Sequence, residues 1–405
     1  SSRYVIINFG QQPFSYTPPT GYASLSGHNR ATANAAGVVN PKRHFECLTW
    51  DGNSTQDRNI TGLEFKPDMI WIKSYTHSTY GGGLVYHHLI WDVLRGVGSN
   101  TIGASSRKEL TVNESYEEGR GANYTDYYGH VSSFNENGFQ LDHVSGQPPF
   151  YTNQTSRSYV AWCWKAGGAG VSNSDGDITT TVSVNQEAGF SMFTYTGNGS
   201  NGQTVGHGLS KAPQWIIVKS RSNAQNWRVW HHKLAADGSK RLLLDATNVS
   251  EDASFLNDTA PTSTVFTLGN ADDAWNANSA KFIVYCWHEI PGFSKFGNYK
   301  GNGSSDGTFV YLGFRPAWLM VKKTNTANNF VIFDNKRSTT NVIDDYLAAD
   351  DSAAESSTSS VNVDFLSNGF KFRSGYDIVN AGDYVYMAFA ERPSETMFGL
   401  DANAR

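Results

Sequence analysis

Four pairs of adjacent acidic residues are the side chains in this sequence best suited to hydrolysing a glycosidic bond. The pairs are Glu117-Glu118, Asp272-Asp273, Asp344-Asp345 and Asp350-Asp351. Glycoside hydrolysis needs two carboxyl groups, roughly 5–10 Å apart, that face the same sugar ring. Adjacent residues in a strand point to opposite faces, and acidic pairs in segments rich in Ser, Ala and Asn are typical of solvated loops. The sequence therefore predicts no catalytic residues. A polysaccharide depolymerase ranks third, after the two non-enzymatic functions given at the end of this subsection.

Two histidine pairs, His87-His88 and His231-His232, are the side chains best suited to binding a transition metal. Each pair follows an aromatic residue in a segment with strand composition, so alternation sends one ring inward and the other outward. A related segment reads Phe333-Asp334, which indicates a packing position followed by an exposed one. A structural role is therefore favoured, with a metal shared across a symmetric trimer axis as the alternative.

Two acidic turns, 174–177 and 304–307, offer oxygen ligands for Ca²⁺. Neither has the full signature of a calcium-binding loop, and ordinary turn chemistry explains both. The sequence therefore predicts no metal site and no cofactor, with Ca²⁺ as a minor alternative.

A tyrosine-rich region is the best candidate for binding another molecule. Tyrosine gives a large amphipathic contact area with few rotatable bonds, and nearby polar side chains can hydrogen-bond hydroxyl groups. The candidate binding residues are Tyr75, His77, Tyr80, Tyr116, Arg120, Asn123, Tyr124, Asp126, Tyr127 and Tyr128, together with Trp275. The alternative is that these loops pack on a neighbouring repeat or subunit. Both are interaction roles, and the two are equally supported.

Three repeated blocks organise the chain. One block begins at Pro67, Pro213 and Pro316, and in each copy a Lys follows the Pro by six residues. A closing block begins at Tyr159, Phe282 and Tyr384, and reads Tyr-Val-Ala-Trp-Cys-Trp-Lys in its first copy. We therefore expect three homologous repeats. The first is longer than the others by about 23 residues between these two blocks, and the insertion contains most of the tyrosine-rich region.

The closing block also explains two of the three cysteines. Cys163 and Cys286 take the same place in two copies, and Ala388 takes it in the third. A position that accepts alanine between large aromatic residues predicts a small buried side chain. A catalytic thiol or a metal ligand is not expected there.

The repeated blocks are short runs of Val, Ile, Trp, Tyr and Phe bounded by Gly, Asn, Asp, Ser and Pro, which is the pattern of strands and tight turns. The prediction is an all-β fold of tandem antiparallel domains resembling β-sandwiches or jelly rolls. The domains are expected at 41–166, 186–291 and 292–405, with a flexible Gly/Ser linker at 167–185. Short helices are expected at most around 233–237 and 341–348.

The composition excludes several classes of protein. With 32 Lys and Arg against 37 Asp and Glu, the net charge is −5, which implies no basic surface for nucleic acid. No run approaches the roughly 18–20 apolar residues of a membrane span. An aromatic content of 13% argues against a disordered chain. We therefore expect no nucleic-acid partner, no membrane insertion and no signal peptide.

Residues 1–40 match none of the repeats and contain Asn8-Phe-Gly-Gln-Gln-Pro-Phe-Ser-Tyr16. This segment resembles the end of a SPRY-type β-sandwich found in tail-fibre-like proteins of marine tailed phages, including cyanophages. Val205-Gly-His-Gly-Leu209 and Gly313-Phe-Arg-Pro-Ala-Trp318 are similar to an uncharacterised β-rich domain that follows the SPRY module in such proteins. The resemblance covers nearly the whole chain and carries no established catalytic residues. It implies that residues 1–40 end an upstream SPRY-like domain, and that the chain begins within a longer protein.

The resemblance implies a virion structural protein, namely a tail fibre or adhesin module whose loops bind a host-surface glycan or protein. The second function considered is a head-decoration or tail-attachment protein whose loops contact other virion subunits. By analogy with phage fibres, we expect a homotrimer on the tail or particle surface, made in the host cytoplasm.

Overall fold

β-branched and aromatic residues dominate the regular structure because their side chains suit the faces of a sheet. The computed structural model describes residues 40–80, 84–100, 107–119, 128–269, 273–391, 394–395 and 401–402. These residues form antiparallel sheets and one 3-10 turn, η1 (Pro41–Arg43). The all-β prediction is confirmed. No helix in the described part of the chain is long and apolar enough to cross a membrane.

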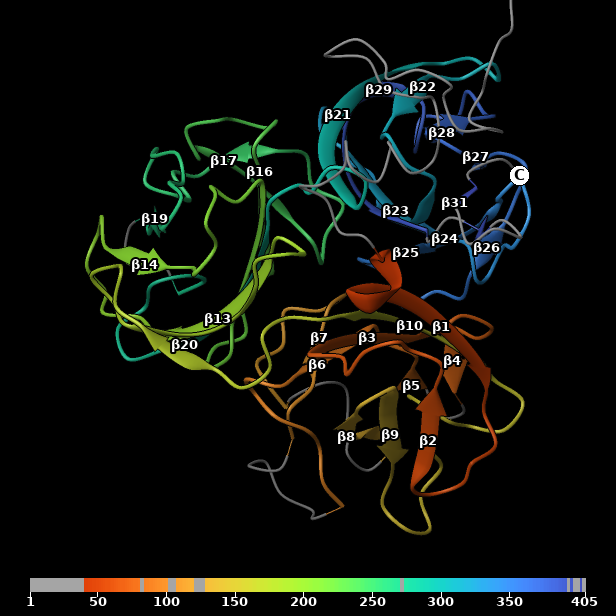
Figure 1. Cartoon of the computed structure of the whole chain (residues 1–405), viewed down its shortest axis with the longest axis horizontal. Coiled ribbons are helices and arrows are strands. Elements are labelled where there is room, and N and C mark those ends of the chain that lie inside the picture. The colour runs from red at the N-terminus through yellow and green to blue at the C-terminus, as the bar shows by residue number, and fades with distance from the viewer. Residues whose placement is uncertain are drawn as a thin grey trace, which may run out of the picture.

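The chain forms three units, each with a large and a small sheet (Figure 1). The large sheet of unit 1 (40–166) contains, in order, β1 (Phe45–Asp51), β10 (Ser158–Trp164), β3 (Met69–Ser74), β6 (Leu89–Asp92) and β7 (Leu110–Thr111). Its small sheet contains β2 (Arg58–Thr61), β9 (Gly138–Asp142) and β8 (His130–Asn135), and a hairpin joins β4 (Thr79–Tyr80) to β5 (Leu84–Val85).

Unit 2 (167–291) has the longest sheet. Its order is β11 (Val171–Asn173), β12 (Thr180–Asn185), β13 (Phe190–Thr196), β20 (Lys281–Trp287), β15 (Trp215–Ser220), β16 (Arg228–His231), β17 (Lys240–Leu243) and β18 (Glu251–Asp252), and β14 (Thr204–Gly206) pairs with β19 (Val265–Thr267). The prediction of a flexible linker at 167–185 is wrong, because β11 and β12 extend this sheet. Ile178 and Val182 explain the difference, since both are buried in the core of unit 2.

Unit 3 (292–391) has a large sheet ordered β21 (Ser294–Asn302), β29 (Ala381–Ala390), β23 (Pro316–Lys323), β24 (Phe330–Asp334), β25 (Asp345–Ala348) and β26 (Ser356–Ser357). Its small sheet contains β22 (Phe309–Tyr311), β28 (Gly369–Phe372) and β27 (Val363–Leu366), and β30 (Ser394–Glu395) pairs with β31 (Asp401–Ala402) beyond it. Both short helix predictions are wrong: 345–348 is a strand, and 233–237 contains turns. In β25, Tyr346 and Leu347 pack on different cores, which is the alternation of a strand.

The closing blocks of the sequence form the strands β10, β20 and β29, which are buried on both faces. One set of side chains, which includes Cys163, Cys286 and Ala388, faces the core of its own unit. The alternate set faces away from that core, and includes Trp164, Trp287 and Phe389. The prediction that the cysteine positions hold small buried side chains is confirmed, since Cys163, Cys286 and Ala388 are each 0% exposed.

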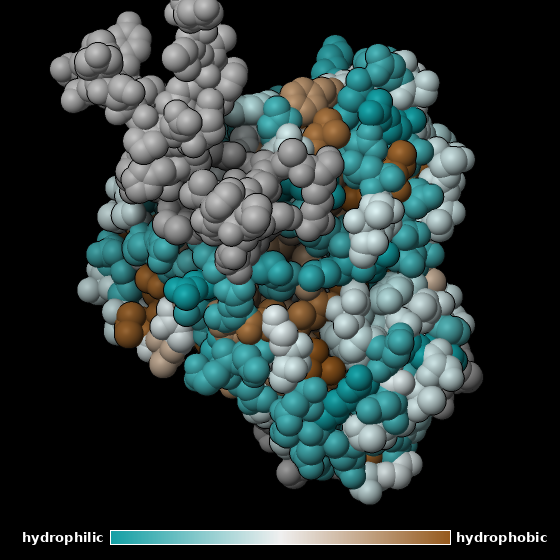
Figure 2. Space-filling view, turned by 45° about the vertical axis from the view of Figure 1, so that its right-hand side comes forward, coloured by the Kyte–Doolittle hydropathy of each residue, from teal (hydrophilic) through white to brown (hydrophobic). Residues whose placement is uncertain are grey.

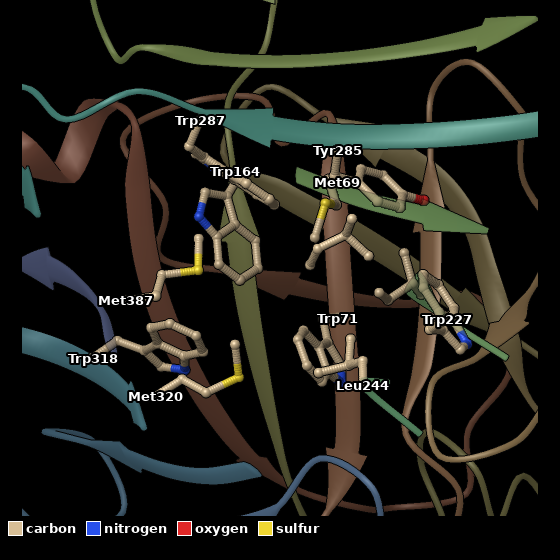
Figure 3. Close-up of a pocket in the computed structure, with 12 residues that line it drawn as sticks. Met69, Trp71, Trp164, Trp227, Leu244, Tyr285, Trp287, Trp318, Met320 and Met387 are labelled. Carbon is tan, nitrogen blue, oxygen red and sulfur yellow. The ribbon is translucent and has the colours of Figure 1, made fainter. Parts of the chain in front are cut away.

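The outer faces of the three large sheets meet in one hydrophobic cluster, the central core, to which all three units contribute (Figure 3). The Trp164 ring lies 6.4 Å from Trp287, 6.0 Å from Trp318 and 5.8 Å from Phe389. The gap enclosed there is about 10 Å³, room for about one water molecule. The central core is therefore packing and not a ligand cavity, and it joins the units into one body.

The three units contact one another in a cyclic order, with the same contact at each junction. At each junction a backbone N–H of one unit donates to a backbone carbonyl just after β3, β15 or β23 of the unit that follows it in the order 1, 2, 3, 1. These pairs are Glu355 to Tyr75 (2.8 Å), Glu118 to Arg221 (3.1 Å) and Ser250 to Thr324 (3.1 Å). The arrangement gives a single chain an approximate threefold ring.

The lysines of the repeated Pro block reinforce this ring. Each ammonium donates across a junction, from Lys73 to the Ser352 carbonyl (3.0 Å), from Lys219 to Ser115 (2.9 Å) and from Lys322 to Thr247 (3.0 Å). Burial lowers the pKa of Lys73 and Lys219 to about 7 and that of Lys322 to about 8. Carbonyl oxygens accept a hydrogen bond from either the charged or the neutral amine.

These lysines predict that the free energy of unfolding rises between pH 7 and pH 9. In this window the unfolded chain keeps lysine protons that the native state releases, so a higher pH favours the native state. The expected gain is on the order of 1–2 kcal/mol per lysine. Urea unfolding followed by tryptophan fluorescence at pH 7, 8 and 9 measures it. The Lys73→Met variant should show a smaller rise, and a flat or falling profile in the native chain would contradict the prediction.

Candidate functional site

Three of the predicted binding residues meet on one aromatic cluster in unit 1. The cluster contains His77, Tyr86, His87, Tyr116, Tyr128, Phe150 and Tyr151, and is called the unit-1 aromatic cluster below. Its centre is Phe150, whose ring lies 4.8 Å from Tyr128, 5.5 Å from Tyr86 and 4.1 Å from Tyr151. His77 lies 6.5 Å from Tyr86, and Tyr116 lies 6.5 Å from His87.

A turn after Pro148-Pro149 positions the centre of the cluster. The N–H groups of Phe150 and Asn153 donate to the Pro148 and Pro149 carbonyls, and the Tyr159 hydroxyl of β10 donates to the Phe150 carbonyl (2.8 Å). Tyr128 is tied to this turn because its carbonyl accepts from the Tyr151 N–H (3.0 Å). Tyr128 is therefore the member of the cluster that follows directly on residues 120–127 in the sequence, which lie outside the described residues.

The cluster has a buried base and a partly exposed rim. Tyr86, Phe150 and Tyr151 are at most 1% exposed, whereas His77, Tyr116 and Tyr128 are half-buried. Aromatic side chains held in this way present part of each ring without free rotation, which lowers the entropy lost on binding. The rim can therefore bind a ligand or a neighbouring subunit through ring faces and hydroxyl groups.

The electrostatics of the cluster favour neutral side chains. Burial lowers the pKa of His87 to about 4, and burial together with Arg157 lowers the pKa of His77. Burial, and then the negative charge of Glu109, raises the pKa of the Tyr151 phenol. Neither His87 nor Tyr151 changes protonation near pH 7, and the lowered pKa of His77 favours its neutral ring, so these groups are suited to hydrogen bonding and packing.

The remaining predicted binding residues have different positions. Tyr75 is half-buried and packs against the central core, and its carbonyl is the acceptor for Glu355 of unit 3. This position fits the alternative in which the loop packs on a neighbouring repeat. Tyr80 pairs through its backbone with Leu84, and its side chain is outside the part of the chain that the structure describes. Also outside the described residues are Arg120, Asn123, Tyr124, Asp126 and Tyr127.

The prediction that Trp275 is a binding residue is wrong. It was expected as a weaker surface-binding candidate, but it is 1% exposed and packs on Phe255 in the core of unit 2. The guanidinium groups of Arg228 and Arg241 lie 5.7 and 5.4 Å from its ring centroid. The Asn- and Asp-rich context indicated a loop correctly, but it carried no information on which way the indole would point.

Sequence reasoning missed four members of the cluster: Tyr86, His87, Phe150 and Tyr151. The Pro148-Pro149 pair could have indicated a rigid turn carrying two aromatic residues. No local pattern places that turn against residues 77, 116 and 128, because the contacts are long-range.

The predicted equivalence of the two histidine pairs is wrong. In the sheets, Met69 pairs with Asp92, Trp215 with His231, and Trp318 with Asp334. His231 therefore corresponds to Asp92 and Asp334, whereas His87-His88 precedes β6. Asp334 was expected to be exposed but is 0% exposed, because it accepts a hydrogen bond from Arg337 at a unit junction (2.7 Å).

The acidic pairs also include half-buried members that were expected to be solvated. Glu118 of unit 1 accepts from the Arg221 guanidinium of unit 2 (2.5 Å). Asp350 accepts from the Phe330 N–H (3.0 Å) and the Asn329 amide (3.1 Å), and burial raises its pKa to about 6. These contacts give both carboxyl groups structural partners. The described residues contain no group of three or more His, Cys, Asp or Glu side chains arranged to hold a metal ion.

Comparison with known proteins gives one match. A family model described as a domain of unknown function (DUF7483) matches residues 40–393, which covers all three units. No curated protein and no solved structure matches the chain.

Proposed function

The chain belongs to the DUF7483 family, and from that premise we propose that it is a structural module of a phage particle, a tail fibre or adhesin component without enzymatic activity. It displays loops that bind a host-surface glycan or protein. The unit-1 aromatic cluster forms the binding surface, and Arg120, Asn123, Tyr124, Asp126 and Tyr127, which lie outside the described residues, stay candidate binding residues. Other virion subunits are its assembly partners, and the homotrimer expected from phage fibres remains part of the proposal.

The observation that carries this proposal is the partly exposed rim of His77, Tyr116 and Tyr128 on a buried aromatic base. A rim fixed to one rigid body suits binding, because little conformational entropy is lost when a ligand docks. The neutral His87 ring and Tyr151 phenol of the cluster support recognition in preference to proton transfer.

A head-decoration or tail-attachment protein is the second candidate. It is favoured by the half-burial of Tyr116 and Tyr128, which also suits a surface that a neighbouring subunit covers. A polysaccharide depolymerase stays third, because Glu118 and Asp350 have structural partners.

Removing two tyrosines that shortly precede Tyr128 in the sequence tests the proposal. The Tyr124→Ala/Tyr127→Ala variant is expected to lose about tenfold in binding to host cells, because each aromatic contact contributes about 0.5–1.5 kcal/mol and the variant removes two. Flow cytometry of cells incubated with the labelled chain measures the loss. Tyr376→Ala is the matched control, since Tyr376 is 50% exposed and lies in unit 3. Unchanged binding of the double variant, with those loops buried against a virion subunit by cryo-EM, would contradict adhesion and support assembly.

A further inference from the structure

The outer face of β22 in unit 3 carries two exposed aromatic side chains. Phe309 is 43% exposed and Tyr311 is 60% exposed, whereas Val310 between them packs inward. Few large hydrophobic side chains are exposed in the described residues, and the face in Figure 2 is mostly hydrophilic. Two exposed rings on one three-residue strand are therefore a local concentration that asks for an explanation.

The corresponding strands of the other units show that the fold does not require these rings. Val310 pairs with Phe370, as Ile60 of β2 pairs with Phe139 and Val205 of β14 pairs with Phe266. In this register, Phe309 corresponds to Asn59 of unit 1 and Thr204 of unit 2. Tyr311 corresponds to Thr61 of unit 1 and Gly206 of unit 2. The same scaffold thus accepts small or polar residues at both places.

A hollow of about 620 Å³ adjoins Tyr311 at the connection between units 2 and 3. Its polar lining includes Glu289, Ser294, Lys295, Ser367 and Asn368. Lys295 holds the edge of the hollow, because its ammonium donates to the Tyr311 carbonyl (3.1 Å) and lies 5.4 Å from the Tyr311 ring centroid. The ring keeps most of its surface exposed despite this contact.

These groups match the chemistry of a sugar chain. Two residues apart on a strand, the rings stand about 7 Å from each other, so adjoining sugar units can contact both. Sugar hydroxyl groups donate and accept, and the carboxylate, ammonium, amide and hydroxyl groups of the hollow offer both roles. An apolar peptide would cover the Glu289 carboxylate and the Asn368 amide without offering them hydrogen-bonding partners, at a cost in free energy.

The charges around the rings balance. Glu289 and Lys295 carry opposite charges in the hollow, and Lys371, which faces Phe309 across the sheet, forms an ion pair with Asp306 (2.5 Å). A balanced surface does not favour a strongly anionic or cationic ligand.

We propose that β22 and the adjoining hollow of unit 3 form a second binding site, and that its ligand is a neutral oligosaccharide. Phe309 and Tyr311 stack on sugar rings, and Glu289, Lys295 and Asn368 hydrogen-bond their hydroxyl groups. The proposal takes its ligand class from the proposed function, but its site is separate from the unit-1 aromatic cluster.

The test exchanges the rings for the residues that unit 1 carries at the same places. The full chain and its Phe309→Asn/Tyr311→Thr variant are applied to an array of neutral and acidic hexose oligosaccharides. We expect the native chain to bind neutral members and the variant to bind them at least about tenfold less. The melting temperature should change little, because the fold tolerates these residues in unit 1. Tyr376→Ala, which removes an exposed ring elsewhere in unit 3, should bind as the native chain does.

Several outcomes would overturn this proposal. Equal binding by the chain and its variant, preference for acidic members, or no binding to the array would each do so. A change in oligomeric state of the variant by sedimentation, without a loss of glycan binding, would identify the face as a protein interface instead. The Tyr124→Ala/Tyr127→Ala variant on the same array separates the two sites: loss only in that variant supports unit 1 and rejects unit 3, and loss only in the β22 variant does the reverse.

Discussion

Replacing Trp164 by alanine is expected to lower the free energy of unfolding by about 3–5 kcal/mol, because it leaves a large cavity in a close-packed core. Trp164 is 2% exposed, and its ring contacts Phe45 of its own unit, Trp287 of unit 2 and Phe389 of unit 3. The loss should therefore reach all three units. Urea unfolding measures the change, and amide hydrogen exchange shows where it occurs, with faster exchange expected in β10, β20 and β29.

A matched control separates the central core from the core of a single unit. Trp50 belongs to the core of unit 1 and stacks on Tyr159, 5.6 Å away. Trp50→Ala should also destabilise the protein, but its effect on hydrogen exchange should be concentrated in unit 1. If Trp164→Ala speeds exchange in unit 1 alone, the units are more independent than their shared packing indicates.

Replacing Asp334 by alanine is expected to cost about 3–5 kcal/mol, since it leaves the Arg337 guanidinium buried without its main partner. Both side chains are 0% exposed, and their atoms Oδ2 and Nε lie 2.7 Å apart. Asp334 also accepts from the Trp162 indole N–H of unit 1 (3.1 Å), so the change affects a junction as well as unit 3. Chemical denaturation of the purified chain measures the cost.

Unit 2 provides the control for this prediction, because it has no such ion pair. His231 of unit 2 occupies the position of Asp334 in unit 3. Three residues further on, unit 2 has Leu234 where unit 3 has Arg337. Since Ser250 makes the junction contact that Glu355 makes in unit 3, the variant Asp334→His/Arg337→Leu/Glu355→Ser reproduces the arrangement of unit 2. We expect it to cost less than Asp334→Ala, with a residual loss from the unpaired Trp162 N–H. A larger cost than the single variant would show that the ion pair itself stabilises the junction.

The same exchange of residues between units is available for binding. The β22 aromatics have polar counterparts in unit 1, so a loss of binding in the exchanged variant would not be explained by a damaged sheet. This internal comparison follows from the shared pairing of the three small sheets.

The sequence determined the features that short segments encode. Runs of β-branched and aromatic residues between turn residues predicted an all-β chain, and the alternation of Cys163 or Ala388 with large aromatics predicted small buried positions. The turn residues that bound the strands include Asn137-Gly138 and Asn368-Gly369, and both glycines lie where a Cβ would collide with a carbonyl oxygen of the facing strand. These features depend on the backbone preferences and side-chain alternation of neighbouring residues, which a single sequence contains.

Only the tertiary structure decided which faces meet. It placed Trp164, Trp287 and Phe389 in a core shared by three units. It showed that 167–185, expected to be a linker, contains two strands, and that Trp275 and Asp334 are buried. It also brought His77, Tyr116 and Tyr128 onto the aromatic base of Phe150 and Tyr151, residues that the sequence had not joined. Strand composition specifies that a side chain points to one face or the other, but not what covers that face. The residues that pack on a given face can lie a few hundred positions away in the sequence. The free energy gained by burying the two apolar surfaces against each other decides which faces pack together.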